Sequence, residues 1–195
     1  MNRPANGLLD RARCCLAVID VQAFFLDKLP GEQRAPLVAR IAWLMRAALA
    51  LDIPLLATAE DTPRLGSLVP ELATLLPAGT PVHNKVVFGL AGQGDIRAAA
   101  EATGRDQFVL AGLETDVCIT QSAFGLMEAG HAVAVVVDGC ASPAPHHDIA
   151  IQRLQAAGAA IMTVKSVYYD WVRDLATLAR VKAKIGGDLP AGLTL

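Results

Sequence analysis

The sequence has few aromatic residues, few charged residues and no long apolar run. Aromatic residues make up 5% and charged residues 18% of its 195 residues, with 17 lysines and arginines and 19 aspartates and glutamates. No basic stretch is interleaved with aromatic residues, as nucleic acid binding would require. The apolar runs are far shorter than the roughly 20 residues of a membrane-spanning helix. We therefore predict neither a nucleic acid partner nor a membrane partner.

Cysteine is also scarce, and its spacing does not suit a disulfide framework. The four cysteines include one adjacent pair and show no regular spacing, which is typical of a reducing compartment. Residues 1–15 carry several charges and no long apolar stretch, so they do not resemble a secretory signal. We expect free thiols and a cytoplasmic location. The cysteines are Cys14, Cys15, Cys118 and Cys140.

Motifs for metals and cofactors are missing. In "GLAGQGD" (89–95), Gly92 and Gly94 lack the third glycine and the later acidic residue of a dinucleotide-binding loop. The histidines lack the spacing of a zinc site, and ordinary core or surface roles are expected for them. We predict no cofactor and no metal. The histidines are His83, His131, His146 and His147.

What the sequence has is a large apolar fraction, 53% of all residues. A domain of this size buries roughly 70% of the surface of its unfolded chain. No linker or internal repeat interrupts the chain. We therefore predict a single domain over residues 1–195, with a core over about 14–175 and a C-terminal helix and tail over 176–195.

Short apolar runs alternate with helical patterns about six times along the chain. This alternation predicts a three-layer α/β/α sandwich around a mostly parallel six-stranded sheet of Rossmann-like order 3-2-1-4-5-6. The run at 15–22 is typical of a strand buried on both faces. The expected strands are 15–22, 53–60, 80–87, 106–112, 131–140 and 159–164, and the expected longer helices are 35–52, 94–104, 116–130, 146–158 and 167–184.

Three chemically active residues come near the ends of expected strands. Asp20 follows the first strand, Lys85 lies near the end of the third and Cys118 follows the fourth. Ligands bind at the carboxyl ends of the strands in such sheets. With the predicted order, Asp20 and Cys118 are about 4.8 Å apart by strand spacing, and the stem of Lys85 reaches across most of a gap of roughly 10 Å.

These residue types suit nucleophilic catalysis. A free thiol is mostly protonated at neutral pH, so a catalytic cysteine needs a base or a nearby positive charge. Asp20 can be the base, while Lys85 and the start of a helix supply positive charge, so we expect Cys118 to ionise easily. Taken singly, Cys118 could instead be a buried apolar residue, Asp20 a cap and Lys85 a surface amine.

Longer segments resemble the isochorismatase-like cysteine hydrolase family. They are "LAVIDVQ" (16–22), "HNKVVFG" (83–89) and "GLETDVCITQSAFGLMEAGHAVAVVVDGCAS" (112–142), and the likeness extends over about 14–175. "TAEDTPRLGSLVPEL" (58–72) is similar to the small isochorismatase-domain hydrolases. The resemblance implies the isochorismatase-like hydrolase fold. It also implies a catalytic triad of Asp20, Lys85 and Cys118.

The resemblance implies further features of the site. A cis peptide bond is expected between Leu113 and Glu114, and the backbone amides of Glu114 and Cys118 are expected to form an oxyanion hole. Gln22 is expected to support the triad through hydrogen bonds. The zinc-binding histidine of the nicotinamidase branch is missing from residues 58–66, which argues against a catalytic metal.

Aromatic residues leave two alternatives open. Phe25 and Phe88 could form an apolar wall of the pocket or belong to the core. A cluster in the last helix could form a subunit interface or pack within the monomer. Family likeness implies a homo-oligomer, a dimer or larger. The members of that cluster are Tyr168, Tyr169 and Trp171.

Together these patterns predict a metal-independent hydrolase, an amidase that acts on a small-molecule amide or ester through a thioester on Cys118. The resemblance also implies acyl chemistry, because the members of the family that cleave a vinyl ether generally lack a cysteine at the position of Cys118. Two alternatives remain, namely a vinyl-ether hydrolase in which Asp20 acts as the acid, and a catalytically silent binding or scaffold protein.

Overall fold

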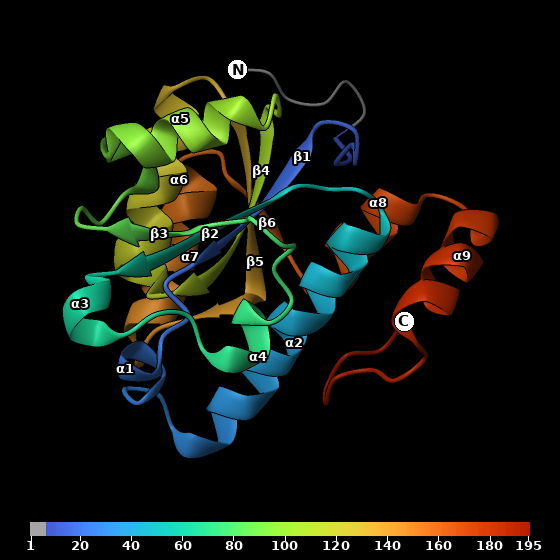
Figure 1. Cartoon of the computed structure of the whole chain (residues 1–195), viewed down its shortest axis with the longest axis horizontal. Coiled ribbons are helices and arrows are strands. Elements are labelled where there is room, and N and C mark those ends of the chain that lie inside the picture. Colours follow the sequence, from blue (N-terminus) through green and yellow to red (C-terminus); the bar gives the residue numbers. More distant parts are fainter. Residues whose placement is uncertain (1–6) are drawn as a thin grey trace.

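The fold is built on one sheet of six parallel strands in the order β3-β2-β1-β4-β5-β6 (Figure 1). The computed structural model describes residues 7–195. The predicted fold class and strand order are confirmed. Residues 1–6, which belong to the predicted domain and to the segment that does not resemble a secretory signal, lie outside the described residues. The strands are β1 (Cys14–Ile19), β2 (Leu55–Glu60), β3 (Val82–Lys85), β4 (Gln107–Leu113), β5 (Ala132–Ala141) and β6 (Ala160–Met162).

Helices cover both faces of the sheet (Figure 1). One face carries α2 (Gly31–Ala50), α4 (Pro70–Ala73), α8 (Val164–Val172) and α9 (Leu175–Ile185). The other carries α5 (Gly94–Ala102), α6 (Thr120–Glu128) and α7 (His146–Ala156). None of the helices in residues 7–195 combines the length and the apolar character needed to cross a membrane. Short elements in the connections are α1 (Ala23–Leu26), α3 (Thr62–Leu65), η1 (Leu90–Gly92) and η2 (Thr115–Ile119).

Strand β1 lies between two apolar cores, and all six of its residues are fully buried. Side chains alternate across a strand, so Leu16 and Val18 pack with α2, whereas Ala17 and Ile19 pack beneath α6. A strand covered on both faces needs apolar residues at every position. This explains why the sequence here is continuously apolar and confirms the prediction of a strand buried on both faces.

The prediction of one last helix over 167–184 is wrong. The structure has two helices, α8 and α9, separated at Arg173, whose φ of 62° interrupts the helical backbone. The Asp174 carboxylate then caps α9 by accepting a hydrogen bond of 2.7 Å from the Thr177 amide. The sequences of α8 and α9 both have a helical pattern, so the pattern alone does not reveal the break, which the local cap creates.

The aromatic cluster of α8 packs mainly within the monomer. Tyr168 and Trp171 are fully buried, and the Tyr168 ring lies 4.9 Å from that of Trp43 on α2 in an edge-on arrangement. Tyr169 is 41% exposed. Packing inside the chain therefore accounts for two of the three residues considered for an interface.

Candidate active site

The candidate site lies where the connections of β1 and β4 leave the sheet in opposite directions. The chain after β1 continues to α2 on one face, and the chain after β4 continues to α6 on the other. This divergence leaves a crevice at the carboxyl ends of the two strands. Gly112 allows close contact there, because its φ is 134° and an added Cβ would overlap the Ile19 carbonyl oxygen. Asp20 and Cys118 follow these strands.

Asp20 and Lys85 form a buried ion pair. Lys85 Nζ lies 2.9 Å from Asp20 Oδ2, and both side chains are completely inaccessible to solvent. Thr58 Oγ1 donates a hydrogen bond of 2.8 Å to the other carboxylate oxygen. The lysine stem thus crosses from β3 over β2 to the end of β1. Burial of both charges requires such pairing, because an isolated buried charge is very costly.

Cys118 lies in η2, the wide helical turn that leads into α6, and its side chain points to the same cluster. Lys85 Nζ donates to Cys118 Sγ at 3.4 Å. The thiol in turn donates to Glu60 Oε2 at 3.3 Å. The residue is 2% exposed. The structure therefore brings Asp20, Lys85 and Cys118 into one cluster.

Glu60 is a fourth member of this cluster, and sequence reasoning assigned it no role. It ends β2 directly opposite Lys85 in the parallel register, and its Oε2 lies 3.5 Å from Lys85 Nζ. The available signal was a charged residue opposite a lysine at the end of two neighbouring apolar strands.

Gln22 holds the backbone of Glu60. Its Oε1 accepts a hydrogen bond of 2.7 Å from the Glu60 amide, and its Nε2 donates to the carbonyl oxygens of Glu60 at 2.8 Å and Gly66 at 2.7 Å. These bonds position the end of β2. The resemblance implies support of the triad through hydrogen bonds, whereas these hydrogen bonds hold the backbone of Glu60 and Gly66.

Burial and the neighbouring charges together set the direction of the pKa shifts in the cluster. It raises the pKa of Asp20, which the ammonium of Lys85 partly offsets. For Lys85, burial lowers the pKa, but the Asp20 carboxylate and the Cys118 sulfur outweigh it and the net shift is upward. Burial, followed by the Asp20 charge, raises the pKa of Cys118, and Lys85 only partly counters this. The expectation of an easily ionised thiol is therefore wrong, because it neglected burial.

The connection between β4 and η2 contains a cis peptide bond between Leu113 and Glu114, the position that the family resemblance implies. The Glu114 carbonyl oxygen accepts a hydrogen bond of 3.1 Å from the Ile119 amide and so belongs to the turn that carries the cysteine. The Glu114 carboxylate pairs with Lys28 Nζ at 3.0 Å. Its side chain is thus tied to a cation from another segment.

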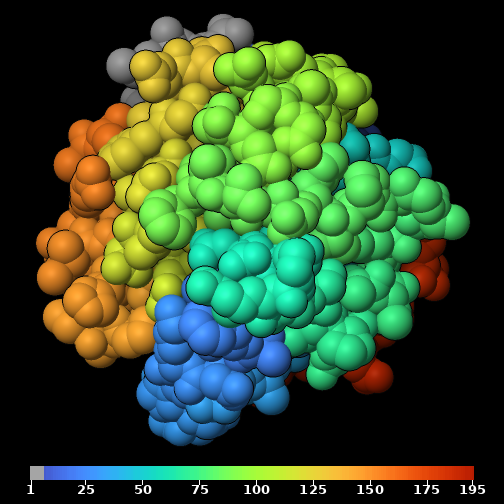
Figure 2. All heavy atoms as spheres, turned by 60° about the vertical axis from the view of Figure 1, so that its left-hand side comes forward, coloured from blue at the N-terminus to red at the C-terminus, as the bar shows by residue number. Residues whose placement is uncertain are grey.

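The two phenylalanines differ in position. Phe25 is 4% exposed and belongs to the core, with the Lys28 ammonium 4.7 Å from its ring centre. Phe88 is 52% exposed and lines a cavity of about 290 Å³ beside the cluster. Figure 2 shows that the segments after β2 (teal) and β3 (green) lie side by side on this face. The cavity is lined by Glu60, Asp61, Arg64, Lys85, Val86 and Phe88.

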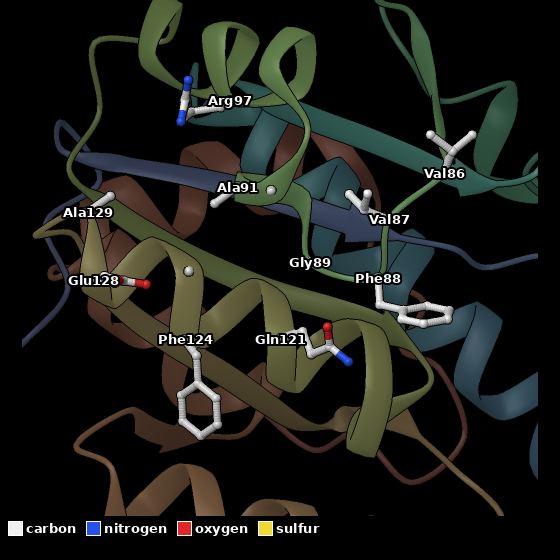
Figure 3. A pocket seen from close by; sticks show the side chains of 12 residues that line it. Val86, Val87, Phe88, Gly89, Ala91, Arg97, Gln121, Phe124, Glu128 and Ala129 are labelled. Atoms are coloured by element: carbon white, nitrogen blue, oxygen red, sulfur yellow. The ribbon is translucent and has the colours of Figure 1, made fainter.

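A larger, open groove of about 790 Å³ adjoins this cavity (Figure 3). The segment 86–92 forms one side, and α6 forms the other with Gln121 and Phe124. The two sides approach closely, because a Cβ on Gly89 would lie 2.9 Å from the Gln121 carbonyl oxygen. Phe88 lines both the groove and the smaller cavity.

One trio within residues 7–195 has ligand-type atoms close enough to hold a metal ion. A carboxylate oxygen of Asp20, one of Glu60 and the sulfur of Cys118 lie within 4.8 Å of one another. Lys85 Nζ lies 2.9, 3.5 and 3.4 Å from these groups. Its ammonium supplies the positive charge that a metal would supply and repels a second cation. The trio therefore fits an amine-centred charge cluster better than a metal site.

Comparisons with known proteins agree with one another. The family model described as Isochorismatase domain matches residues 14–166. Isochorismatase domain-containing protein 2 of Bos taurus is 30% identical over 175 residues, which cover 88% of this chain and 81% of that protein. "Probable hydrolase YcaC" of Escherichia coli (strain K12) is 30% identical over 178 residues, which cover 88% and 85%.

Solved structures also resemble this chain. The YcaC gene product of Escherichia coli, described as an octameric hydrolase of unknown specificity, has a TM-score of 0.79 at 25% identity and covers 92% of this chain and 91% of its own. YcaC from Pseudomonas aeruginosa, with hexane-2,5-diol and covalent acrylamide, has a TM-score of 0.83 at 28% identity and covers 94% and 93%.

Proposed function

The chain belongs to the isochorismatase family of hydrolases, and from this premise we propose that it hydrolyses a small amide or ester through a thioester on Cys118. The observation that carries the proposal is the buried cluster in which Lys85 Nζ contacts both Asp20, at 2.9 Å, and Cys118, at 3.4 Å. A charge pair sealed beside a thiol at the ends of parallel strands is typical of a catalytic site.

Asp20 is the general base of the first step. Because the pKa of Cys118 is raised, the thiol gives up its proton only as its sulfur attacks the carbonyl carbon. Asp20, whose own pKa is raised by burial, accepts that proton more readily than an exposed carboxylate would. Lys85 stays charged and stabilises the sulfur and the carboxylate in turn.

The backbone amides of Glu114 and Cys118 are assigned to the oxyanion of the tetrahedral intermediate. Glu114 directly precedes η2 and Cys118 lies within it, and the first amides of a helix have no carbonyl partner inside that helix. Collapse of the intermediate breaks the bond to the leaving nitrogen or oxygen, and Asp20 returns its proton to that atom. The products of this half-reaction are an amine or alcohol and an acyl group on Cys118.

The size and lining of the cavity support a small substrate. The cavity beside the cluster measures about 290 Å³, and Glu60, Lys85 and Phe88 are among the residues that line it. The relative from Pseudomonas aeruginosa was solved with covalent acrylamide, itself a small primary amide. By analogy with that protein, small uncharged amides are the first compounds to test.

A panel of small primary amides and matching methyl esters tests the proposal. Replacement of Cys118 by Ser or of Asp20 by Asn should lower the rate of hydrolysis by about 10²-fold to 10⁴-fold. Cys140→Ser is the matched control, because Cys140 is also a buried free thiol but belongs to the core beneath α6. Equal activity of the wild type and the Cys118→Ser variant would contradict the proposal.

Vinyl-ether hydrolysis is the alternative chemistry, since the raised pKa of Asp20 also suits an acid. That reaction does not need the thiol. Vinyl-ether hydrolysis would be favoured if the Cys118→Ser variant still cleaved a vinyl ether and the wild type hydrolysed no amide or ester. If neither substrate class reacts but compounds bind, the chain is a silent binding protein.

We propose that the chain forms a homo-oligomer in the cytoplasm. Val86 is 70% and Phe88 is 52% exposed, an unusual degree of exposure for two large apolar residues so close together beside a site. The relative YcaC of Escherichia coli is octameric. A second copy of this chain that covers Val86 and Phe88 would remove this apolar surface from water.

A further inference from the structure

Two carboxylates lie beside Cys118, and they differ in their access to the cavity. The side chain of Asp20 is completely buried and is absent from the described lining of the cavity. The side chain of Glu60 is 18% exposed and is part of that lining. Of the two carboxylates, Glu60 is therefore the one that lines the cavity, whereas neither Asp20 nor Cys118 belongs to that lining.

The contacts of the two carboxylates also differ. Asp20 uses one oxygen for Thr58, at 2.8 Å, and the other for Lys85, at 2.9 Å. Glu60 Oε2 accepts the hydrogen bond of the Cys118 thiol at 3.3 Å and lies farther from Lys85, at 3.5 Å. Both carboxylates thus interact with the Cys118 thiol, and that of Glu60 lies farther from the Lys85 ammonium than that of Asp20 does.

The backbone around Glu60 is held in place by side-chain hydrogen bonds. Gln22 is fully buried, and both the oxygen and the nitrogen of its side-chain amide form hydrogen bonds with the backbone of Glu60 or Gly66. The end of β2 is therefore held in place, and the direction in which Glu60 leaves the strand is set. Such positioning is what a group that must meet a reacting atom needs.

We propose that Glu60 is a further catalytic residue, the general base that activates water to hydrolyse the thioester on Cys118. The inference rests on the proposed function and divides the work between the two carboxylates. Asp20 handles the proton of the first half-reaction, and Glu60 handles that of the second. A base must lie within hydrogen-bond reach of the water that it activates, and Glu60 faces the space that water can enter.

The proton balance of this step closes on groups in the site. Water forms a bond to the acyl carbon while one of its protons passes to the Glu60 carboxylate. The tetrahedral intermediate then collapses, and the bond between that carbon and the sulfur breaks. The leaving thiolate takes the proton from Glu60, along the same contact of 3.3 Å seen in the resting site. A free carboxylic acid leaves, and Cys118 and Glu60 regain their original states.

The test uses Glu60→Gln, which keeps the size of the side chain and removes its basicity. The substrate is p-nitrophenyl acetate, because the burst of p-nitrophenolate reports acylation and the later linear phase reports deacylation. We expect a burst close to that of the wild type and a linear phase slower by about 10²-fold or more. Glu71→Gln is the matched control, since Glu71 is an exposed residue of α4.

Hydroxylamine separates a catalytic role from a structural one. It is a strong nucleophile that needs no general base, so it should release the acyl group from Glu60→Gln at nearly the wild-type rate. Glu60→Asp keeps a carboxylate and should recover part of the water reaction. A merely distorted site would slow hydroxylamine and water alike, and that result would overturn the inference.

The remaining outcomes are distinguishable. If the wild type and Glu60→Gln hydrolyse the acyl group at the same rate, the role of Glu60 is overturned and the proposed function stays intact. Equal slowing of the burst and of the linear phase would do the same. Failure of the wild type to form any acyl group on Cys118 would overturn the proposed function, and the inference would fall with it.

Discussion

Replacement of Lys85 by methionine should destabilise the fold severely, although methionine fills a similar volume. The substitution removes the ammonium that lies 2.9 Å from the Asp20 carboxylate, and neither side chain has any contact with solvent. Loss of one partner of a buried ion pair costs about 3–5 kcal/mol, because the other charge stays behind unpaired. For a chain of this length, that corresponds to a melting temperature lower by roughly 6–20 °C.

The loss should depend on pH. Burial already raises the pKa of Asp20, and the substitution removes the charge that holds this shift in check. The folded-state pKa then lies further above the value of about 3.9 in the unfolded chain. The charge on Asp20 therefore costs stability as the pH rises through the folded-state pKa, and protonation relieves that cost as the pH falls. The difference in the free energy of unfolding between the wild type and Lys85→Met should therefore be smaller at pH 5 than at pH 8.

Urea unfolding at both pH values, followed by circular dichroism, measures this difference. Arg97→Met is the control, because Arg97 pairs with Glu101 at 3.9 Å with both side chains more than half exposed, and such pairs contribute about 1 kcal/mol or less. The double variant Asp20→Asn, Lys85→Met should lose less unfolding free energy than the two single variants lose in sum. If Lys85→Met costs no more than the control, or if its cost does not change with pH, the reasoning is refuted.

Three further results are expected. Gly112→Ala should lower the melting temperature sharply, because its Cβ would overlap the end of β1, whereas Gly94→Ala has open space and should change little; equal effects would contradict the close strand contact. Alkylation of Cys118 by iodoacetamide should be slow at pH 7, and its rate should keep rising with pH beyond the usual thiol pKa of about 8.5, because the pKa of Cys118 is raised. A rate that reaches a plateau below pH 8 would contradict this shift. Val86→Asp should lower the mass of the proposed homo-oligomer in light-scattering measurements, and an unchanged mass would exclude this surface from the interface.

Much of the fold could be predicted from the sequence because its strands are distinct. The fully apolar run of β1 and the helical pattern of α2 each have one clear interpretation, and short connections then favour a parallel sheet. The convergence of Asp20, Lys85 and Cys118 followed from the strand order alone. In a parallel sheet, residues that end neighbouring strands share one edge.

Other features depended on contacts that no local pattern contains. The Asp174 cap that separates α8 from α9 is recognisable only when the chain turn at Arg173 is known. The raised pKa of Cys118 depends on how deeply the sulfur is buried, and a sequence gives the nearby charges more readily than the depth. Glu60 was overlooked because a charged residue at a strand end is usually solvated.

The central claim is that Cys118 carries the substrate's acyl group during turnover. Intact-mass measurement and peptide mapping of a reaction quenched with acid test this claim directly, with a primary amide from the panel as substrate. The account predicts one acyl group per chain, on the peptide that contains Cys118, removable by hydroxylamine and missing from Cys118→Ser. Turnover of the amide with no acyl group on the protein, or with the group on another cysteine, would contradict it.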